Sequence, residues 1–260
     1  MSPGTDRPDG APLLHGATIT IEGRHARRWV SGLLEHLSGA AADGDARPGS
    51  RARPGQVDAA VLLEAAICQD DARLDAQAAI ADADPHALRV VAQMAALPLL
   101  QACGRAIGGE APAPWLKGYC PVCGAWPALS EFRGLERKRW LRCGRCGAGW
   151  EMPWLWCAFC DETNHEQLGY LTPAEGEPTR RAEVCYRCKG YLKALATVRA
   201  LPEWGVLLED LTTVSLDVAA LDRGYHRPER PGYAPEVRIL TGSGGFWSRS
   251  LGRGGRAADP

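Results

Sequence analysis

The sequence has 260 residues, of which 45% are hydrophobic and 23% charged, as in a globular protein with one large domain or a few small ones. The formal net charge of -1 excludes a general attraction to polyanions such as nucleic acid. The first residues lack the apolar run of a secretory signal, and the most apolar stretches are too short to span a bilayer. We therefore expect a cytoplasmic protein without membrane insertion.

Residues 1–112 are rich in alanine and predict a helical domain. Apolar residues recur at helical spacing over 24–38, and the Gly/Pro-rich, charged stretch 42–56 predicts a mobile loop. Two further helices are predicted over 57–83 and 86–107, separated by an Asp-Pro pair because proline disfavours helix in the residue before it.

Eight of the ten cysteines lie within residues 113–200, in four C-x-x-C pairs. The pairs are Cys120/Cys123, Cys143/Cys146, Cys157/Cys160 and Cys185/Cys188. A C-x-x-C turn presents two thiolates on one side of the backbone, and two such turns complete a tetrahedral site with four sulfur ligands. We predict two metal ions, Fe or Zn, each held in a four-cysteine site. The remaining cysteines, Cys68 and Cys103, lie in Ala/Leu-rich stretches and are predicted to pack as small apolar residues.

The spacing favours pairing in sequence order, which gives a first module over 113–152 and a second over 153–200. The alternative is an interleaved arrangement, with the first C-x-x-C joined to the third and the second to the fourth. In sequence order the tryptophan seam, residues 150–156, lies between the two modules. Its tryptophans would pack the modules together or onto the helices.

The chemistry of a site with four thiolate ligands is restricted, because no coordination position is left open for water. Such a site stabilises a fold or passes an electron. A thioredoxin-type interpretation is disfavoured because the pairs do not lie where a strand opens a helix in a βαβ pattern. We identify no catalytic triad, zinc-protease motif or nucleotide-binding glycine motif, and so predict no catalytic residues, no cofactor-binding residues and no enzyme activity.

Two charged stretches have a functional and a plainer interpretation. Residues 133–145 contain six basic side chains, which suit nucleic-acid binding or simply the solvated side of a hairpin. A C-terminal helix is predicted over 201–228, with Asp210 and Asp217 on one face for a partner or for solvent. For both stretches we favour solvent exposure. Residues 229–260 are rich in Pro, Gly and Arg and predict a flexible tail.

Several motifs together resemble the formate dehydrogenase accessory protein family (FdhE-like). They are CPVCGAWP (120–127), LRCGRCGAGWEM (141–152), CAFC (157–160), EVCYRCKGYLKAL (183–195) and EDLTTVSLDVAALDRGYHRP (209–228). The resemblance covers about residues 115–228. Trp154 and Trp156 depart from it, since the family tends to carry basic or polar residues there.

The resemblance implies a cytoplasmic assembly chaperone, not an enzyme, that binds the catalytic subunit of formate dehydrogenase. It implies an α+β fold in which a helical domain precedes two rubredoxin-like modules, with the eight paired cysteines as metal ligands and iron a serious candidate. Two alternatives stay open at this point: a zinc-ribbon protein that binds nucleic acid, and a rubredoxin-like electron carrier.

Overall fold

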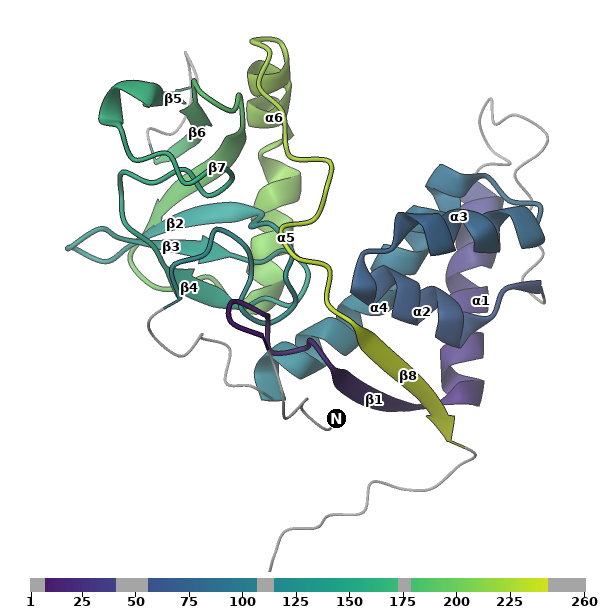
Figure 1. The fold of residues 1–260 in the computed structure, drawn as a ribbon. Helices are drawn as coiled ribbons and strands as arrows, with labels where there is room; N and C mark the ends of the chain where they lie inside the picture. The colour runs from purple at the N-terminus through teal and green to yellow at the C-terminus, as the bar shows by residue number, and fades with distance from the viewer. Residues whose placement is uncertain (1–7, 41–55, 107–114, 173–178, 243–260) are drawn as a thin grey trace, which may run out of the picture.

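The computed structural model describes residues 8–40, 56–106, 115–172 and 179–242, which form a helical lobe and a sheet lobe (Figure 1). Helices and strands are largely segregated between the lobes, so the predicted α+β class is confirmed. A two-stranded sheet lies beside the helices, and α4 extends from the helical lobe towards the sheet lobe (Figure 1).

The helical lobe consists of α1 (Gly23–Ala40), α2 (Ala59–Cys68), α3 (Asp71–Ile80) and α4 (Pro85–Ala106). The helix predicted over 57–83 is in fact two helices. The break is at Gln69, whose φ of 57° is left-handed, and at Asp70, whose carboxylate accepts a hydrogen bond from the backbone N–H of Arg73 and so caps α3. The predicted loop 42–56 lies almost wholly outside the described residues.

The central helix of this lobe is α4, which packs against α1, α2 and α3. Among the described helices it is the one with the length and apolar composition to cross a membrane. Its residues Leu88, Val91, Ala95 and Leu100 are buried against the other helices, which is the environment of a core helix. Cys103 of α4 is buried as predicted.

The two-stranded sheet corrects the predicted tail. Strand β8 (Val237–Gly242) pairs in parallel with β1 (Ala17–Glu22), so the flexible segment does not begin at residue 229. The Pro/Gly/Arg-rich composition of the tail obscured a short alternating stretch, VRILTG, whose Val237 and Ile239 are buried. Residues 243–260 lie outside the described part of the chain.

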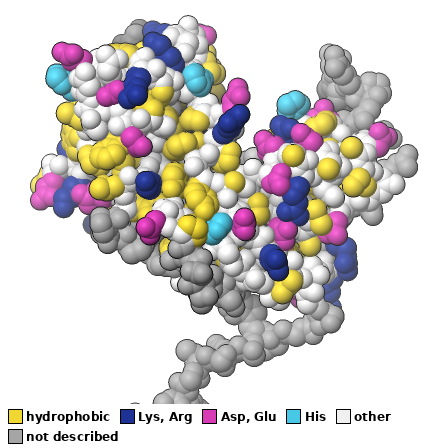
Figure 2. Space-filling model, viewed as in Figure 1, with side chains coloured by type: hydrophobic (Ala, Val, Ile, Leu, Met, Phe, Trp, Pro, Cys, Tyr) yellow, Lys and Arg dark blue, Asp and Glu magenta, His cyan; other side chains and the backbone are white. Residues whose placement is uncertain are grey.

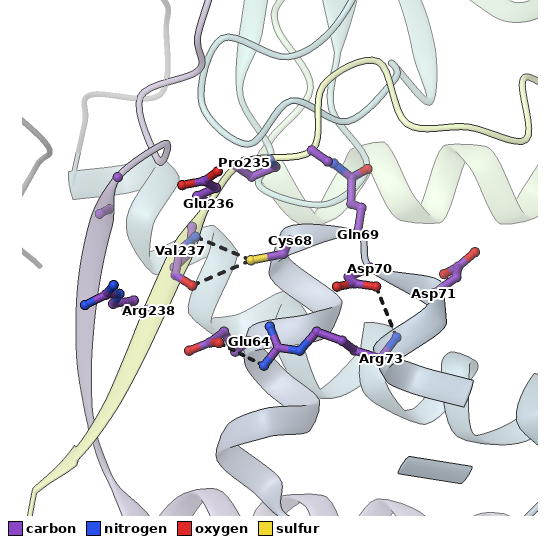
Figure 3. Close-up of a pocket in the computed structure, with 13 residues that line it drawn as sticks. Glu64, Cys68, Gln69, Asp70, Asp71, Arg73, Pro235, Glu236, Val237 and Arg238 are labelled. Carbon is purple, nitrogen blue, oxygen red and sulfur yellow. Dashed lines mark hydrogen bonds and ion pairs between the residues drawn. The ribbon is translucent and has the colours of Figure 1, made fainter. Parts of the chain in front are cut away.

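Side chains of α2 satisfy the other edge of β8 (Figure 3). The Glu64 carboxylate accepts a hydrogen bond of 2.8 Å from the backbone N–H of Ile239. Figure 3 shows the Cys68 sulfur in contact with both the N–H and the carbonyl of Val237. Cys68 is only half-buried, but burial still raises the pKa of its thiol and keeps it protonated. Cys68 therefore supplies the hydrogen-bond partners at this edge of β8 that a neighbouring strand would otherwise supply.

The sheet lobe is built on one six-stranded sheet in the order β4-β3-β2-β7-β6-β5. Its strands are β2 (Leu129–Arg133), β3 (Lys138–Arg142), β4 (Gly149–Glu151), β5 (Leu168–Leu171), β6 (Arg180–Cys185) and β7 (Tyr191–Thr197). The first three strands come from the first predicted module and the last three from the second. The modules join through parallel pairing of β2 with β7, so they share one sheet rather than packing as separate bodies.

The predicted C-terminal helix is two helices, α5 (Glu203–Thr212) and α6 (Val214–Leu221), which meet at Thr213 and cover one face of the sheet. Asp210 and Asp217 do not form a solvated face. Both lie 2.7 Å from the buried ammonium of Lys193 on β7, and both also pair with Arg227. A buried cation requires such partners, so these carboxylates fasten the helices to the sheet.

Candidate metal centres

The eight paired cysteines gather into two clusters, which follow sequence order. Cys120, Cys123, Cys143 and Cys146 form the first cluster, and Cys157, Cys160, Cys185 and Cys188 form the second. Within each cluster the four sulfurs lie within 4.8 Å of one another. The structure thus has the sequential arrangement and not the interleaved one.

The spacing of the sulfurs fits a tetrahedral ion. Cys120 and Cys146 are 3.5 Å apart, as are Cys123 and Cys143, and the facing pairs of the second cluster are 3.7 Å apart. Metal–sulfur bonds of about 2.3 Å in a tetrahedron place the ligand sulfurs about 3.8 Å from each other. Sulfurs at this separation are not disulfides, and all eight thiols are free.

Each C-x-x-C pair lies on the same tight turn. In three of the turns the residue after the second cysteine donates its N–H to the carbonyl of the first, as in the bond of 2.9 Å from Gly124 to Cys120. That residue has a positive φ in all four turns. Gly124 and Gly147 hold this position in the first cluster, whereas Asp161 and Lys189 hold it in the second. Glycine at this position therefore distinguishes the first site from the second.

The clusters differ in exposure. All four sulfur-bearing residues of the first are fully buried and belong to the main core, together with residues of the helical lobe. In the second cluster, Cys160 and Cys188 are partly exposed. The first cluster also touches α4 closely, since a methyl group on Gly104 would lie 2.4 Å from the carbonyl oxygen of Cys146.

Burial and hydrogen bonds within the clusters give the thiols different pKa values. Hydrogen bonds from the thiols of Cys120, Cys123 and Cys146 hold the pKa of Cys143 well below its usual range, while burial raises that of Cys120. In the second cluster burial raises the pKa of Cys188 to about 11. Metal-free clusters of this kind hold thiols as well as thiolate, so binding a metal must release protons.

The basic stretch 133–145 is exposed at Arg137 and Lys138, but three of its other arginines make internal contacts. Arg139 and Arg142 are 3% and 4% exposed and pair with Glu183 and Glu131 respectively. The side chain of Arg145 reaches the carbonyl of Ala66 in α2. The stretch was predicted to be mainly solvated, and this is wrong for these three arginines, which join strands and lobes.

The tryptophan seam is divided between core and surface. Trp150 is buried, and its indole N–H donates to the carbonyl of Lys117 over 3.0 Å. Trp154 is 54% exposed, with its ring centroid 4.8 Å from that of Phe132. The sequence placed the seam between the modules but gave no signal for this division.

The comparisons with known proteins agree with this architecture. Residues 155–231, which hold the second cluster, α5 and α6, match the family described as "FdhE, C-terminal domain". This segment is therefore similar to the FdhE C-terminal domain. This confirms the resemblance identified from its cysteine motifs.

Among curated proteins, the FdhE homolog of Aquifex aeolicus is 32% identical over 122 residues, which are 45% of this chain and 41% of that protein. The homolog from Stutzerimonas stutzeri is 39% identical over 127 residues, 47% of this chain and 39% of that protein. The matches thus span about two fifths of the length of these relatives.

The crystal structure of the FdhE protein from Pseudomonas aeruginosa shares the fold, with a TM-score of 0.51 and 24% identity. The alignment covers 87% of this chain and 76% of that one. The helical lobe therefore belongs to the common fold even though the two sequence matches described above each cover less than half of the chain.

Proposed function

We propose that this chain is a non-enzymatic accessory protein that binds the catalytic subunit of formate dehydrogenase in the cytoplasm during its assembly. The observation that supports this most is the match of residues 155–231 to the FdhE C-terminal domain. That segment includes the partly exposed cluster and the helices that cover its sheet, so the shared part is a built surface and not an isolated motif.

The eight cysteines would each supply a thiolate to one of two ions, iron or zinc. The donor set and the sulfur spacing fit either metal. Bound there, a metal ties two turns together, and iron in such a site exchanges one electron. Rigid turns keep the intervening loops in one conformation, which lowers the entropy lost when a partner binds.

The nucleic-acid alternative is weakened, because Arg139 and Arg142 are engaged with the carboxylates of Glu183 and of the buried Glu131. The electron-carrier alternative retains one observation, the partial exposure of Cys160 and Cys188. It requires bound iron that is reduced and reoxidised reversibly. A redox titration of the anaerobically purified protein tests it, and a sample containing zinc alone without a redox response would eliminate it.

The decisive experiment for the proposed function is anaerobic co-purification of the tagged full chain with the catalytic subunit of a formate dehydrogenase from the same cell. Metal content is measured on the same sample. We expect specific capture with two metals per chain. A matched Cys188→Ser chain, which lacks one ligand of the second cluster, is the control for the contribution of that cluster to capture and metal content. Absence of the subunit under gentle conditions, with nucleic acid eluting in a salt-dependent way, would overturn the assembly role.

A further inference from the structure

A cavity of about 340 Å³ lies between the tryptophan seam and the sheet. Lys193 of β7 points towards α5 and α6, so its neighbour Leu192 points to the opposite face, where it lines this cavity. The volume is within the usual range of a ligand pocket. The cavity therefore occupies the sheet face that these two helices leave uncovered.

A buried arginine holds one wall of the cavity in place. Arg139 donates hydrogen bonds of 3.0 and 3.1 Å to the carbonyl oxygens of Pro153 and Trp156, and a third to Glu183. Between the two anchored carbonyls, Trp154 and Leu155 are 54% and 56% exposed. Two adjacent large apolar side chains are thus held at the surface by an internal clamp.

The cavity also contains a cation without a carboxylate partner among the described residues. Arg181 lies over the rings of Phe132 and Tyr170, at 4.8 and 4.9 Å from their centroids. The nearby carboxylate of Glu183 is already paired with Arg139 at 2.7 Å. The lining is therefore apolar and aromatic with one uncompensated positive charge, which complements an apolar group that carries an anion.

We propose that this cavity binds an extended segment of a partner protein in which a large apolar side chain lies next to a carboxylate. A peptide fits better than a small molecule because part of the lining, formed by Trp154, Leu155 and Tyr170, is itself exposed at the protein surface. Tryptophan, tyrosine and arginine are also the residue types that contribute most to protein interfaces.

The sheet provides a second reason for an extended segment. Strand β5, which contributes Leu168 and Tyr170 to the lining, is the last strand of the sheet, and its outer edge has no strand partner in the part of the chain that the structure describes. An extended peptide pairs with such an edge and places alternate side chains in neighbouring pockets. Cys157 and Cys185 line the same cavity, so a docked segment would also shield one side of the second cluster.

Figure 2 shows that hydrophobic side chains gather on the sheet lobe, whereas charged side chains of both signs are spread over the helical lobe. Partner binding through apolar contacts is therefore better suited to the sheet lobe. Arg105 of α4 and Glu203 of α5 form an exposed ion pair that links the two helices. Because the two charges compensate each other, this pair should not compete with Arg181 for an anionic group of the partner.

The test is selection of a random peptide library displayed on phage against the metal-loaded full chain. We expect enriched peptides with an aromatic or branched side chain beside Asp or Glu, and roughly tenfold weaker recovery with Trp154→Ala. Arg181→Glu should exchange the preference for acidic residues for Lys or Arg. Arg181→Gln, which should only weaken it, serves if the charge reversal does not fold.

The matched controls are Trp204→Ala, another exposed tryptophan, on α5, and Arg223→Glu, an exposed arginine just after α6. Both should leave the selected peptides unchanged. Peptides that lack an acidic residue, or recovery that Trp154→Ala and Arg181→Glu do not alter, would overturn the proposal. The absence of any enriched peptide would also overturn the proposal. This holds even if the aromatic anion 8-anilinonaphthalene-1-sulfonate, used as a small-molecule probe, binds to the protein. No formate dehydrogenase is used, so failure here is distinct from failure of the proposed function.

Discussion

The first and second cysteine clusters use the same turn but have different surroundings. The first lies inside a core shared with the helical lobe, with glycine at both left-handed positions. The second lies at the surface, with Asp161 and Lys189 in those positions and two partly exposed cysteines. Similar ligand geometry therefore gives one site embedded in the fold and one that solvent or a partner can reach.

The strongest test of this difference is loss of a ligand from each site. Cys120→Ser should remove one metal and destabilise both lobes, because its cluster shares their core and a structural metal contributes on the order of 10 kcal/mol. Cys188→Ser should also remove one metal but leave the melting of the helical lobe nearly unchanged. Metal analysis and circular dichroism at the helical wavelength measure both. Equal losses of stability, or loss of both metals from either variant, would contradict the distinction.

The two halves of the sheet lobe should also differ, by a smaller amount, in the stability lost when a buried charged residue is replaced. Glu131 of β2 is fully buried and pairs with Arg142 and Arg133, so Glu131→Gln should cost about 3–5 kcal/mol because the buried guanidinium of Arg142 loses its carboxylate.

Lys193→Met is the counterpart over the second module and should cost less than Glu131→Gln, because Asp210 and Asp217 keep Arg227 as a partner. Denaturant unfolding of the two variants compares the costs. A larger loss for Lys193→Met would mean that the second module carries more of the stability than its exposure indicates.

Much of the site was readable from the sequence because its signals are local. A C-x-x-C turn is specified within a few residues, and the spacing of the pairs gave their grouping. Other contacts connect residues that are far apart in the chain. They are the pairing of β2 with β7, the pairing of β1 with β8 and the bonds from Lys193 to two helices. No local period records such contacts, so the shared sheet, the ordered β8 and the internal role of Asp210 were missed.

The turn residues provide the next comparison. A methyl group on Gly124, where φ is +74°, would lie 2.2 Å from the carbonyl oxygen of Tyr233. Gly124→Ala should therefore cost more than the roughly 1–2 kcal/mol of left-handed strain alone. Lys189→Gly in the second cluster should change stability by less than about 1 kcal/mol, since relief of strain offsets the added freedom of the unfolded chain. Thermal unfolding of the metal-loaded variants measures both changes in stability. A stable Gly124→Ala protein would show that the first turn is not confined.

The finest distinction is the rate at which each site loses its metal. Because Cys160 and Cys188 are partly exposed, a chelator should remove metal from the second cluster first, at a rate roughly tenfold above that of the first cluster. Release from the first cluster requires a larger opening of the core.

Acid should accelerate the release of metal from both clusters. The pKa of Cys188 in the metal-free cluster is raised to about 11 by burial, so protons compete for its sulfur across the neutral range and compete more strongly as pH falls. Burial raises the pKa of Cys120 as well, so acidity affects both sites and access sets the order. Stopped-flow chelation with a coloured metal indicator, repeated with Cys188→Ser to identify the fast phase, measures this. A single phase that carries both metals would mean that the two clusters open together, as one unit on their shared sheet.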